Sequence, residues 1–190
     1  MKTWLKHRVY TLAALAILLI AIQCVNSLCG GRLAALGILP RTLDGLWGIP
    51  LSPFIHGDWR HLLSNLPILL VLSALLMTHT VRDYLFSSLA IILIGGLLVW
   101  LFARPAYHIG ASGWIFGLWA LLLAQAITRR RILDLLFALL VLFYYGSIAA
   151  GLLPGDPYIS TESHIAGAIA GVIYAVFTKR KRKPKKENTL

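Results

Sequence analysis

Four polar residues of the kinds used in acyl-transfer chemistry lie at the starts of apolar stretches in this 190-residue sequence. They are the serine Ser112, the histidines His61 and His164, and the asparagine Asn65. A serine hydroxyl becomes a nucleophile when a histidine takes its proton, and N–H groups stabilise the oxyanion that follows. Polar side chains are costly inside a membrane and are candidates for function there. These residues are therefore the first hypothesis for an active site, provided that the chain brings them together.

The stretches that contain them are predicted membrane helices. The sequence is 58% hydrophobic with a mean hydropathy of +0.78, above the roughly 45–50% apolar content of soluble domains. The excess lies in long runs, which are typical of transmembrane segments. We expect an all-α membrane protein, with a six-helix bundle in residues 1–178 and a basic tail at 179–190. The six predicted segments are 9–28, 59–80, 84–103, 112–128, 132–153 and 163–178.

Basic residues orient this predicted bundle. If both termini are cytoplasmic, 14 of the 18 Lys and Arg residues lie on the inner side, as the positive-inside rule requires. Seven of them follow the last segment, where a polybasic stretch is expected to contact anionic lipid. The net charge of +11 therefore indicates a lipid bilayer as partner and no nucleic acid, because no aromatic residues are interleaved with the charge. The expected location is a membrane crossed several times, most simply a bacterial inner membrane.

The predicted topology places the polar residues at one depth. The three segments that contain them run from outside to inside, so depth follows from the distance to the next cytoplasmic basic residue at about 1.5 Å per residue. Asn65 and Ser112 each lie about 26 Å from that boundary and His164 about 23 Å. In a hydrocarbon core about 30 Å thick, all three lie just below the outer surface. A nucleophile, a base and an amide donor then share one layer, as acyl transfer requires.

Glycines predict that the fourth and sixth segments pack closely. Pairs of small residues four apart let helix backbones approach each other, and glycine is otherwise unfavourable inside a helix. Such pairs occur in both segments, as Gly113 with Gly117 and as Gly167 with Gly171. Close packing there would bring Ser112 within hydrogen-bond reach of His164.

The order and spacing of these residues resemble the rhomboid family of intramembrane serine proteases. The family pattern is His-x-x-x-x-His-x-x-x-Asn in the second helix, Gly-x-Ser-Gly at the start of the fourth and His-x-x-Gly-x-x-x-Gly in the sixth. The six-helix topology and a long first outer loop agree as well, so the resemblance covers nearly the whole chain. The matching residues are His56, His61 and Asn65, then Gly110, Ala111, Ser112 and Gly113, then His164, Gly167 and Gly171.

The resemblance implies a Ser–His dyad that cleaves peptide bonds. Ser112 would attack the scissile carbonyl, and His164 would take its proton and pass it to the leaving amine. The backbone N–H of Ser112 and the side chains of His61 and Asn65 would hold the oxyanion. The implied substrates are transmembrane proteins, cut near the outer end of their helix. No cofactor or metal is implied, and nothing in the sequence specifies an oligomeric state.

The resemblance also assigns supporting roles. His56 would brace the first outer loop, and the backbones of Gly110 and Ala111 would lie along the substrate. Two positions depart from the usual family pattern. Phe116 stands where a tyrosine often stacks on the base histidine, and Trp47-Gly48 stands where Trp-Arg is common.

No third, acidic member of a triad is expected. On the predicted topology, three of the seven acids are cytoplasmic and three lie in outer loops. Glu162 is nearest to His164 in sequence, but it is expected to precede the helix, and residues two apart on a helix do not face each other. A ring stacked on His164, for which Phe116 is the candidate, would orient the imidazole instead.

Two other features have open interpretations. The outer connection 29–58 is apolar and rich in proline, which favours a folded structure against the membrane surface over a simple interfacial linker. Cys24 and Cys29 lack metal-ligand spacing, so they are either a disulfide or two unpaired thiols.

Two alternative functions compete with a protease. A catalytically silent relative would share the fold without the dyad, although Ser112 and His164 are both present. A small transporter would need charged residues or broken helices at the bilayer midplane, and the apolar segments contain neither there. Cleavage of a transmembrane reporter distinguishes the three.

Overall fold

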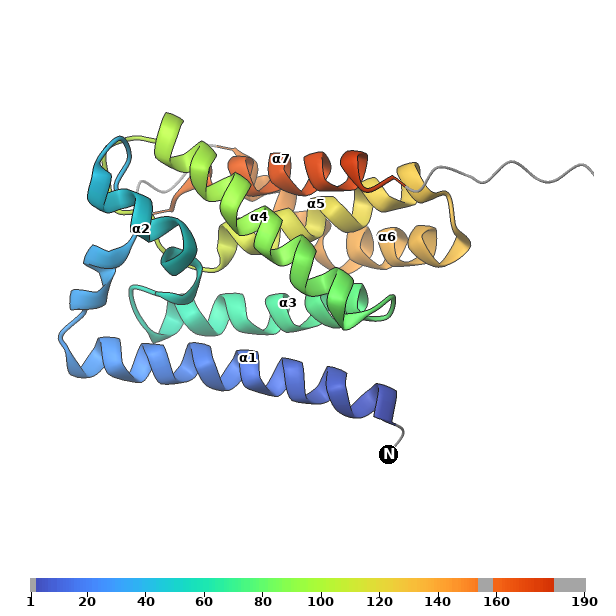
Figure 1. Ribbon diagram of the computed structural model, residues 1–190, viewed down its shortest axis with the longest axis horizontal. Coiled ribbons are helices and arrows are strands. Elements are labelled where there is room, and N and C mark those ends of the chain that lie inside the picture. The colour runs from blue at the N-terminus through green and yellow to red at the C-terminus, as the bar shows by residue number, and fades with distance from the viewer. Residues whose placement is uncertain (1–2, 154–158, 180–190) are drawn as a thin grey trace, which may run out of the picture.

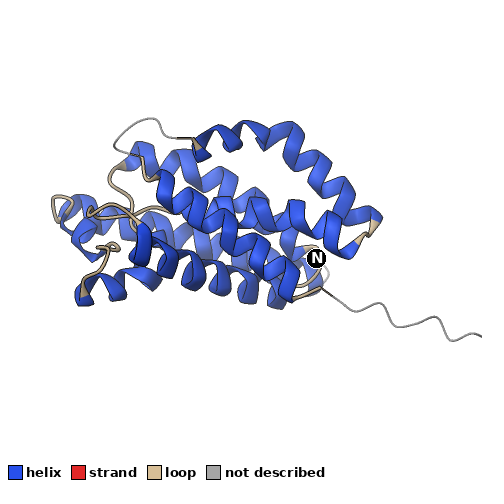
Figure 2. Ribbon diagram, turned by 90° about the horizontal axis from the view of Figure 1, so that it is seen from above, coloured by secondary structure: helices blue, strands red, loops and turns tan. Residues whose placement is uncertain are grey.

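The computed structural model describes residues 3–153 and 159–179, so the predicted basic tail at 179–190 lies outside the described residues except for Lys179 (Figure 1). Within these ranges the chain is helical and contains no strand (Figure 2). One isolated antiparallel bridge joins Ile38 to His108. The prediction of an all-α protein is therefore confirmed.

Each of the six predicted segments contains one long helix. Four stretches, α1, α3, α4 and α6 with its extension, are long and apolar enough to cross a membrane, and α7 is a shorter apolar helix. Six crossings and cytoplasmic termini remain predictions. The bounds are α1 Thr3–Leu28, α3 Trp59–Met77, α4 Val81–Phe102, α5 Ser112–Arg129, α6 Ile132–Tyr145 with a 3₁₀ extension η3 Gly146–Leu152, and α7 Thr161–Phe177.

The largest differences from prediction are at α1 and α6. Helix α1 begins at Thr3, six residues before the predicted start. Its first turns contain basic residues, which end the apolar run but are favourable in a helix. The α-helical part of α6 ends at Tyr145, and the chain continues as the tighter η3. Glycine has a low helix propensity, and η3 begins at Gly146 and contains Gly151.

Helix α5 is the centre of the bundle and packs against α3, α4, α6 and α7 (Figure 1). Every residue from Trp114 to Leu122 is buried. A membrane helix that is buried on all sides needs small residues where a neighbour approaches closely. The approach is closest against α7, where a Cβ on Gly167 would overlap the carbonyl oxygen of Gly113 and one on Gly171 would overlap that of Gly117.

The first outer connection is folded, as its composition predicts. It contains the 3₁₀ turn η1 Arg32–Leu36, the helix α2 Leu43–Leu51 and the 3₁₀ turn η2 Ser52–Phe54. Helix α2 lies at one end of the bundle, beside α4 (Figure 1). The thiols of Cys24 and Cys29, at the end of α1 and the start of this connection, are unpaired and exposed.

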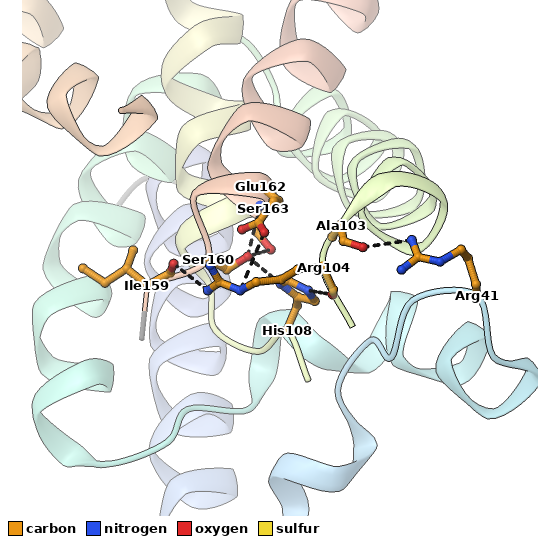
Figure 3. A network of polar contacts seen from close by, with 8 residues as sticks. All are labelled: Arg41, Ala103, Arg104, His108, Ile159, Ser160, Glu162 and Ser163. Carbon is orange, nitrogen blue, oxygen red and sulfur yellow. Dashed lines mark hydrogen bonds and ion pairs between the residues drawn. The ribbon is translucent and has the colours of Figure 1, made fainter. Parts of the chain in front are cut away.

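Arg41 anchors this connection to the bundle. Its guanidinium donates to the carbonyl oxygen of Ala103 at 2.9 Å (Figure 3) and to that of Leu101 at 3.2 Å. Both lie at the end of α4, where a cation is favourable. The indole of Trp100 donates to the Thr42 carbonyl at 2.8 Å. Gly48 stands where the family often has the arginine of Trp-Arg. A side chain does not fit here, because a Cβ on Gly48 would overlap the backbone of Gly37.

Candidate active site

Gly110 sets the position of Ser112, the first residue of α5. Its φ is +109°, in the region that favours glycine. A Cβ on Gly110 would lie 2.7 Å from both Cε1 and Nε2 of His61, so any side chain here would collide with that ring. The Gly110 N–H donates to the Ser52 carbonyl at 2.9 Å, which joins this segment to the first outer connection. Glycine is therefore required for both its conformation and its lack of a side chain.

His56 holds the next residue of the same segment. Its Nε2 accepts from the Ala111 N–H at 3.2 Å, and the ring is fully buried. Burial, with a smaller effect from nearby His61, lowers the pKa of His56 to about 4, so the ring is neutral and can accept. The Asn26 amide of α1 donates to the His56 carbonyl (2.9 Å) and accepts from the Leu33 N–H (3.0 Å). Sequence reasoning missed this brace, although a polar residue deep in an apolar helix was a usable signal.

His164, in the first turn of α7, is held by a backbone carbonyl and a ring. Its Nδ1 lies 2.8 Å from the carbonyl oxygen of Gly151 in η3. A carbonyl only accepts, so we assign the proton to Nδ1, which leaves the lone pair of Nε2 free. The Phe116 ring stacks on the imidazole, with centroids 4.1 Å apart and planes 11° apart. The imidazole is therefore held from two sides, at Nδ1 by the carbonyl and on one face by the ring.

Gly151 was not predicted from the sequence. A Cβ on this residue would lie 2.8 Å from Cζ of Phe116 and 3.3 Å from Nδ1 of His164. The absence of a side chain lets its carbonyl reach the imidazole. The sequence signal was weak, since a glycine within an apolar segment more often reflects helix packing.

No carboxylate reaches His164 within the described part of the chain. Glu162 instead pairs with Arg104, at 3.6 Å between Oε1 and Nε. The expectation that Glu162 precedes the helix is wrong, because α7 already begins at Thr161. Its start is capped by Ser160, whose hydroxyl accepts from the Ser163 N–H at 3.2 Å.

The two members of the predicted dyad lie on adjoining helix ends. A Cβ on Gly113 would lie 3.0 Å from the Ser163 carbonyl oxygen, so the residue after Ser112 contacts the residue before His164. Among the described residues, no hydrogen bond joins the Ser112 hydroxyl to the imidazole. Such bonds are often long before substrate binds and shorten afterwards.

His61 and Asn65 lie one turn apart near the start of α3. The Asn65 amide donates to the His61 carbonyl at 2.7 Å, which uses one of its two N–H groups. The His61 ring contacts Gly110 and packs edge-on to the His56 ring, with centroids 5.0 Å apart. Both side chains of the predicted oxyanion site therefore come from the helix that borders the segment leading into Ser112.

Comparison with known proteins identifies the family to which the chain belongs. The rhomboid domain pattern matches residues 43–181. An uncharacterized protein of Mycobacterium tuberculosis is 37% identical over 176 residues, which cover 87% of this chain and 72% of the relative. An uncharacterized protein of Mycobacterium leprae is 33% identical over 183 residues, 90% of this chain and 71% of the relative. Rhomboid-like protein 11, chloroplastic, of Arabidopsis thaliana is 34% identical over 139 residues, 64% of this chain and 49% of the relative. The chain is an integral membrane protein and belongs to the rhomboid family.

Proposed function

We propose that this protein is an intramembrane serine endopeptidase that uses Ser112 as nucleophile and His164 as general base. The observation that carries the proposal is the hydrogen bond between His164 Nδ1 and the Gly151 carbonyl. It leaves Nε2 as the basic nitrogen on a ring that Phe116 already holds in place. A serine next to such a base, at a helix start with free backbone N–H groups, has what acyl transfer needs.

The proposed reaction has two halves. Ser112 Oγ attacks the scissile carbonyl while His164 Nε2 takes the hydroxyl proton, and the same nitrogen gives that proton to the leaving amine as the C–N bond breaks. Water then attacks the acyl-enzyme and loses a proton to Nε2, which returns that proton to Ser112 Oγ as the ester C–O bond breaks and the acid product leaves. The Gly151 carbonyl holds the imidazolium that forms in each half, where a triad would use a carboxylate.

The oxyanion would be held by the Ser112 N–H, the His61 ring and the second N–H of Asn65. In comparable hydrolases such donors are worth roughly 2.7–4 kcal/mol each. The Ser112 N–H is one of the first in α5 and has no partner within that helix. The backbones of Gly110 and Ala111 would lie along the substrate, and His56 would keep that segment in place.

The proposed substrates are transmembrane segments of other proteins, cut near their outer end. A test is to incubate the purified protein with a reporter that contains one transmembrane segment, and to measure the masses of the products. We expect two fragments from cleavage at one bond, without added cofactor. An intact reporter that still binds would indicate a catalytically silent relative. Uptake of a solute into vesicles without cleavage would indicate a transporter.

Replacing Asn65 tests the oxyanion site. We expect Asn65→Ala to lower kcat by about 10²-fold, because losing one oxyanion donor costs on the order of 10²–10³ in rate. Ser64→Ala, one residue earlier and exposed, is the matched control, since its hydroxyl only donates to the His61 carbonyl. An unchanged kcat for Asn65→Ala would leave this residue a packing role alone.

Replacing acidic residues tests the dyad against a triad. We expect Glu162→Gln and Asp58→Asn to keep activity within about tenfold, a barrier change near 1.4 kcal/mol. The carbonyl of Gly151 already occupies His164 Nδ1, and Asn can replace Asp58 as the cap of α3. Turnover of both variants on one reporter decides the matter. A loss near 10⁴ in either, the scale seen for a true triad acid, would mean that a carboxylate takes part.

A further inference from the structure

His108 lies four residues before Ser112 and is 2% exposed. Its backbone pairs with Ile38, through N–H to carbonyl hydrogen bonds of 2.9 and 3.0 Å in the two directions. Its ring reaches toward the start of α7 (Figure 3). Nδ1 lies 2.6 Å from the Ser160 hydroxyl, and Nε2 lies 3.0 Å from the Arg104 carbonyl oxygen. The ring therefore spans from the segment that leads to Ser112 to the segment that leads to His164.

The partners determine which atom donates and which accepts in each hydrogen bond around His108. Because the Arg104 carbonyl only accepts, His108 Nε2 carries a proton, and in a neutral ring Nδ1 accepts from the Ser160 hydroxyl. The Ser160 oxygen in turn accepts from the Ser163 N–H (3.2 Å) and lies 2.7 Å from the Ser163 hydroxyl, which can donate to it. Every group in this chain of donors then has a partner.

The surroundings of His108 favour its neutral form. Burial lowers the pKa of this ring, and the guanidinium of Arg104 acts in the same direction. The hydrogen bond to the Arg104 carbonyl and the carboxylate of Glu162 oppose the shift without reversing it. The neutral ring, with its proton on Nε2 and Nδ1 accepting from Ser160, is therefore the form expected near neutral pH.

We propose that His108 is a positioning residue, which sets the distance between Ser112 and His164 through Ser160 and Ser163. This inference rests on the proposed function. Ser160 caps α7, and Ser163 contacts Gly113 with its carbonyl and precedes the base. The Arg104 side chain also joins the same two segments, through a long ion pair with Glu162 (3.6 Å) and a hydrogen bond to the Ile159 carbonyl (3.0 Å), but it is partly exposed. Exposed ion pairs contribute little, so the buried histidine is the stronger tie.

The test measures the reactivity of Ser112 directly. A fluorophosphonate labels a serine only when a base activates it, and it needs no transmembrane substrate. We expect His108→Leu to lower both the labelling rate and kcat on a reporter by about 10²-fold, since a misplacement near 1 Å costs that much. KM should change by less than about twofold, because substrate binding is not altered.

Two polar variants separate positioning from general stability. His108→Asn places Oδ1 close to where Nδ1 lies and can accept from Ser160, whereas His108→Gln reaches the Nε2 position and can donate to the Arg104 carbonyl. We expect the Asn variant to label at least tenfold faster than the Gln variant. This comparison holds even if the leucine variant fails to fold. The control Arg104→Gln removes the ion pair and disturbs the exposed hydrogen bond to the Ile159 carbonyl, but it keeps the backbone carbonyl that His108 contacts. This variant should stay within about threefold of wild type.

The outcomes distinguish this inference from the proposed function. If wild-type protein is labelled no faster than denatured protein, the serine protease proposal fails. If wild type is labelled and a folded His108→Leu variant is labelled equally fast, only the positioning role is wrong. Equal rates for the Asn and Gln variants, or an equal loss in Arg104→Gln, would also overturn that role.

Discussion

Ser112→Ala and His164→Ala are each expected to abolish cleavage of a transmembrane reporter. In serine hydrolases, removal of the nucleophile or the base lowers kcat by about 10⁶-fold. The Ser112 hydroxyl makes no hydrogen bond to a described residue, so its removal should leave the thermal midpoint in detergent nearly unchanged. His164→Ala should lower that midpoint, because the Gly151 carbonyl loses its donor.

A further variant separates lost chemistry from lost structure at the base. In His164→Asn the amide N–H can still donate to the Gly151 carbonyl, but the side chain is no base. We expect this variant to unfold closer to wild type than His164→Ala and to be equally inactive. Near wild-type turnover in any of the three variants, with the fold intact, would show that the dyad assignment is wrong.

Gly167→Ala is expected to cause the second largest loss. The added Cβ would overlap the carbonyl oxygen of Gly113, which is backbone and cannot rotate away. Alanine gains roughly 0.5–1 kcal/mol over glycine in a helix, but overpacking typically costs 1–3 kcal/mol. Helices α5 and α7 must then separate, and this moves the base away from Ser112. We expect kcat to fall by about 10²-fold, with a lower midpoint of thermal unfolding.

Gly95→Ala on α4 is the matched control. A Cβ there would lie 3.4 Å from the Cα of Gly167, which is an ordinary contact. This variant should keep full activity and gain slightly in stability from its helix propensity. Equal activity in Gly167→Ala and Gly95→Ala would mean that the close approach of α5 and α7 does not position the site.

The sequence by itself determined the helices and most of the candidate residues. Long apolar runs predict membrane helices because backbone groups in lipid must be satisfied within the segment, and each predicted run contains a long helix. Polar residues within such runs are rare enough to attract attention, which is why Ser112, His61, Asn65 and His164 could be proposed together. Phe116 was also proposed as the ring on His164, and the two rings stack.

Only the tertiary structure decided what holds these residues. The Gly151 carbonyl, the Asn26 brace and the His108 ring act through atoms whose partners are 13, 30 and 52 residues away. A carbonyl oxygen is present in every residue, so no sequence pattern marks the one that faces an imidazole. Likewise, Gly48 and Arg41 depend on which backbone lies opposite them. The helices follow from local composition, but these contacts arise only when the helices pack and each buried polar group must find its partner.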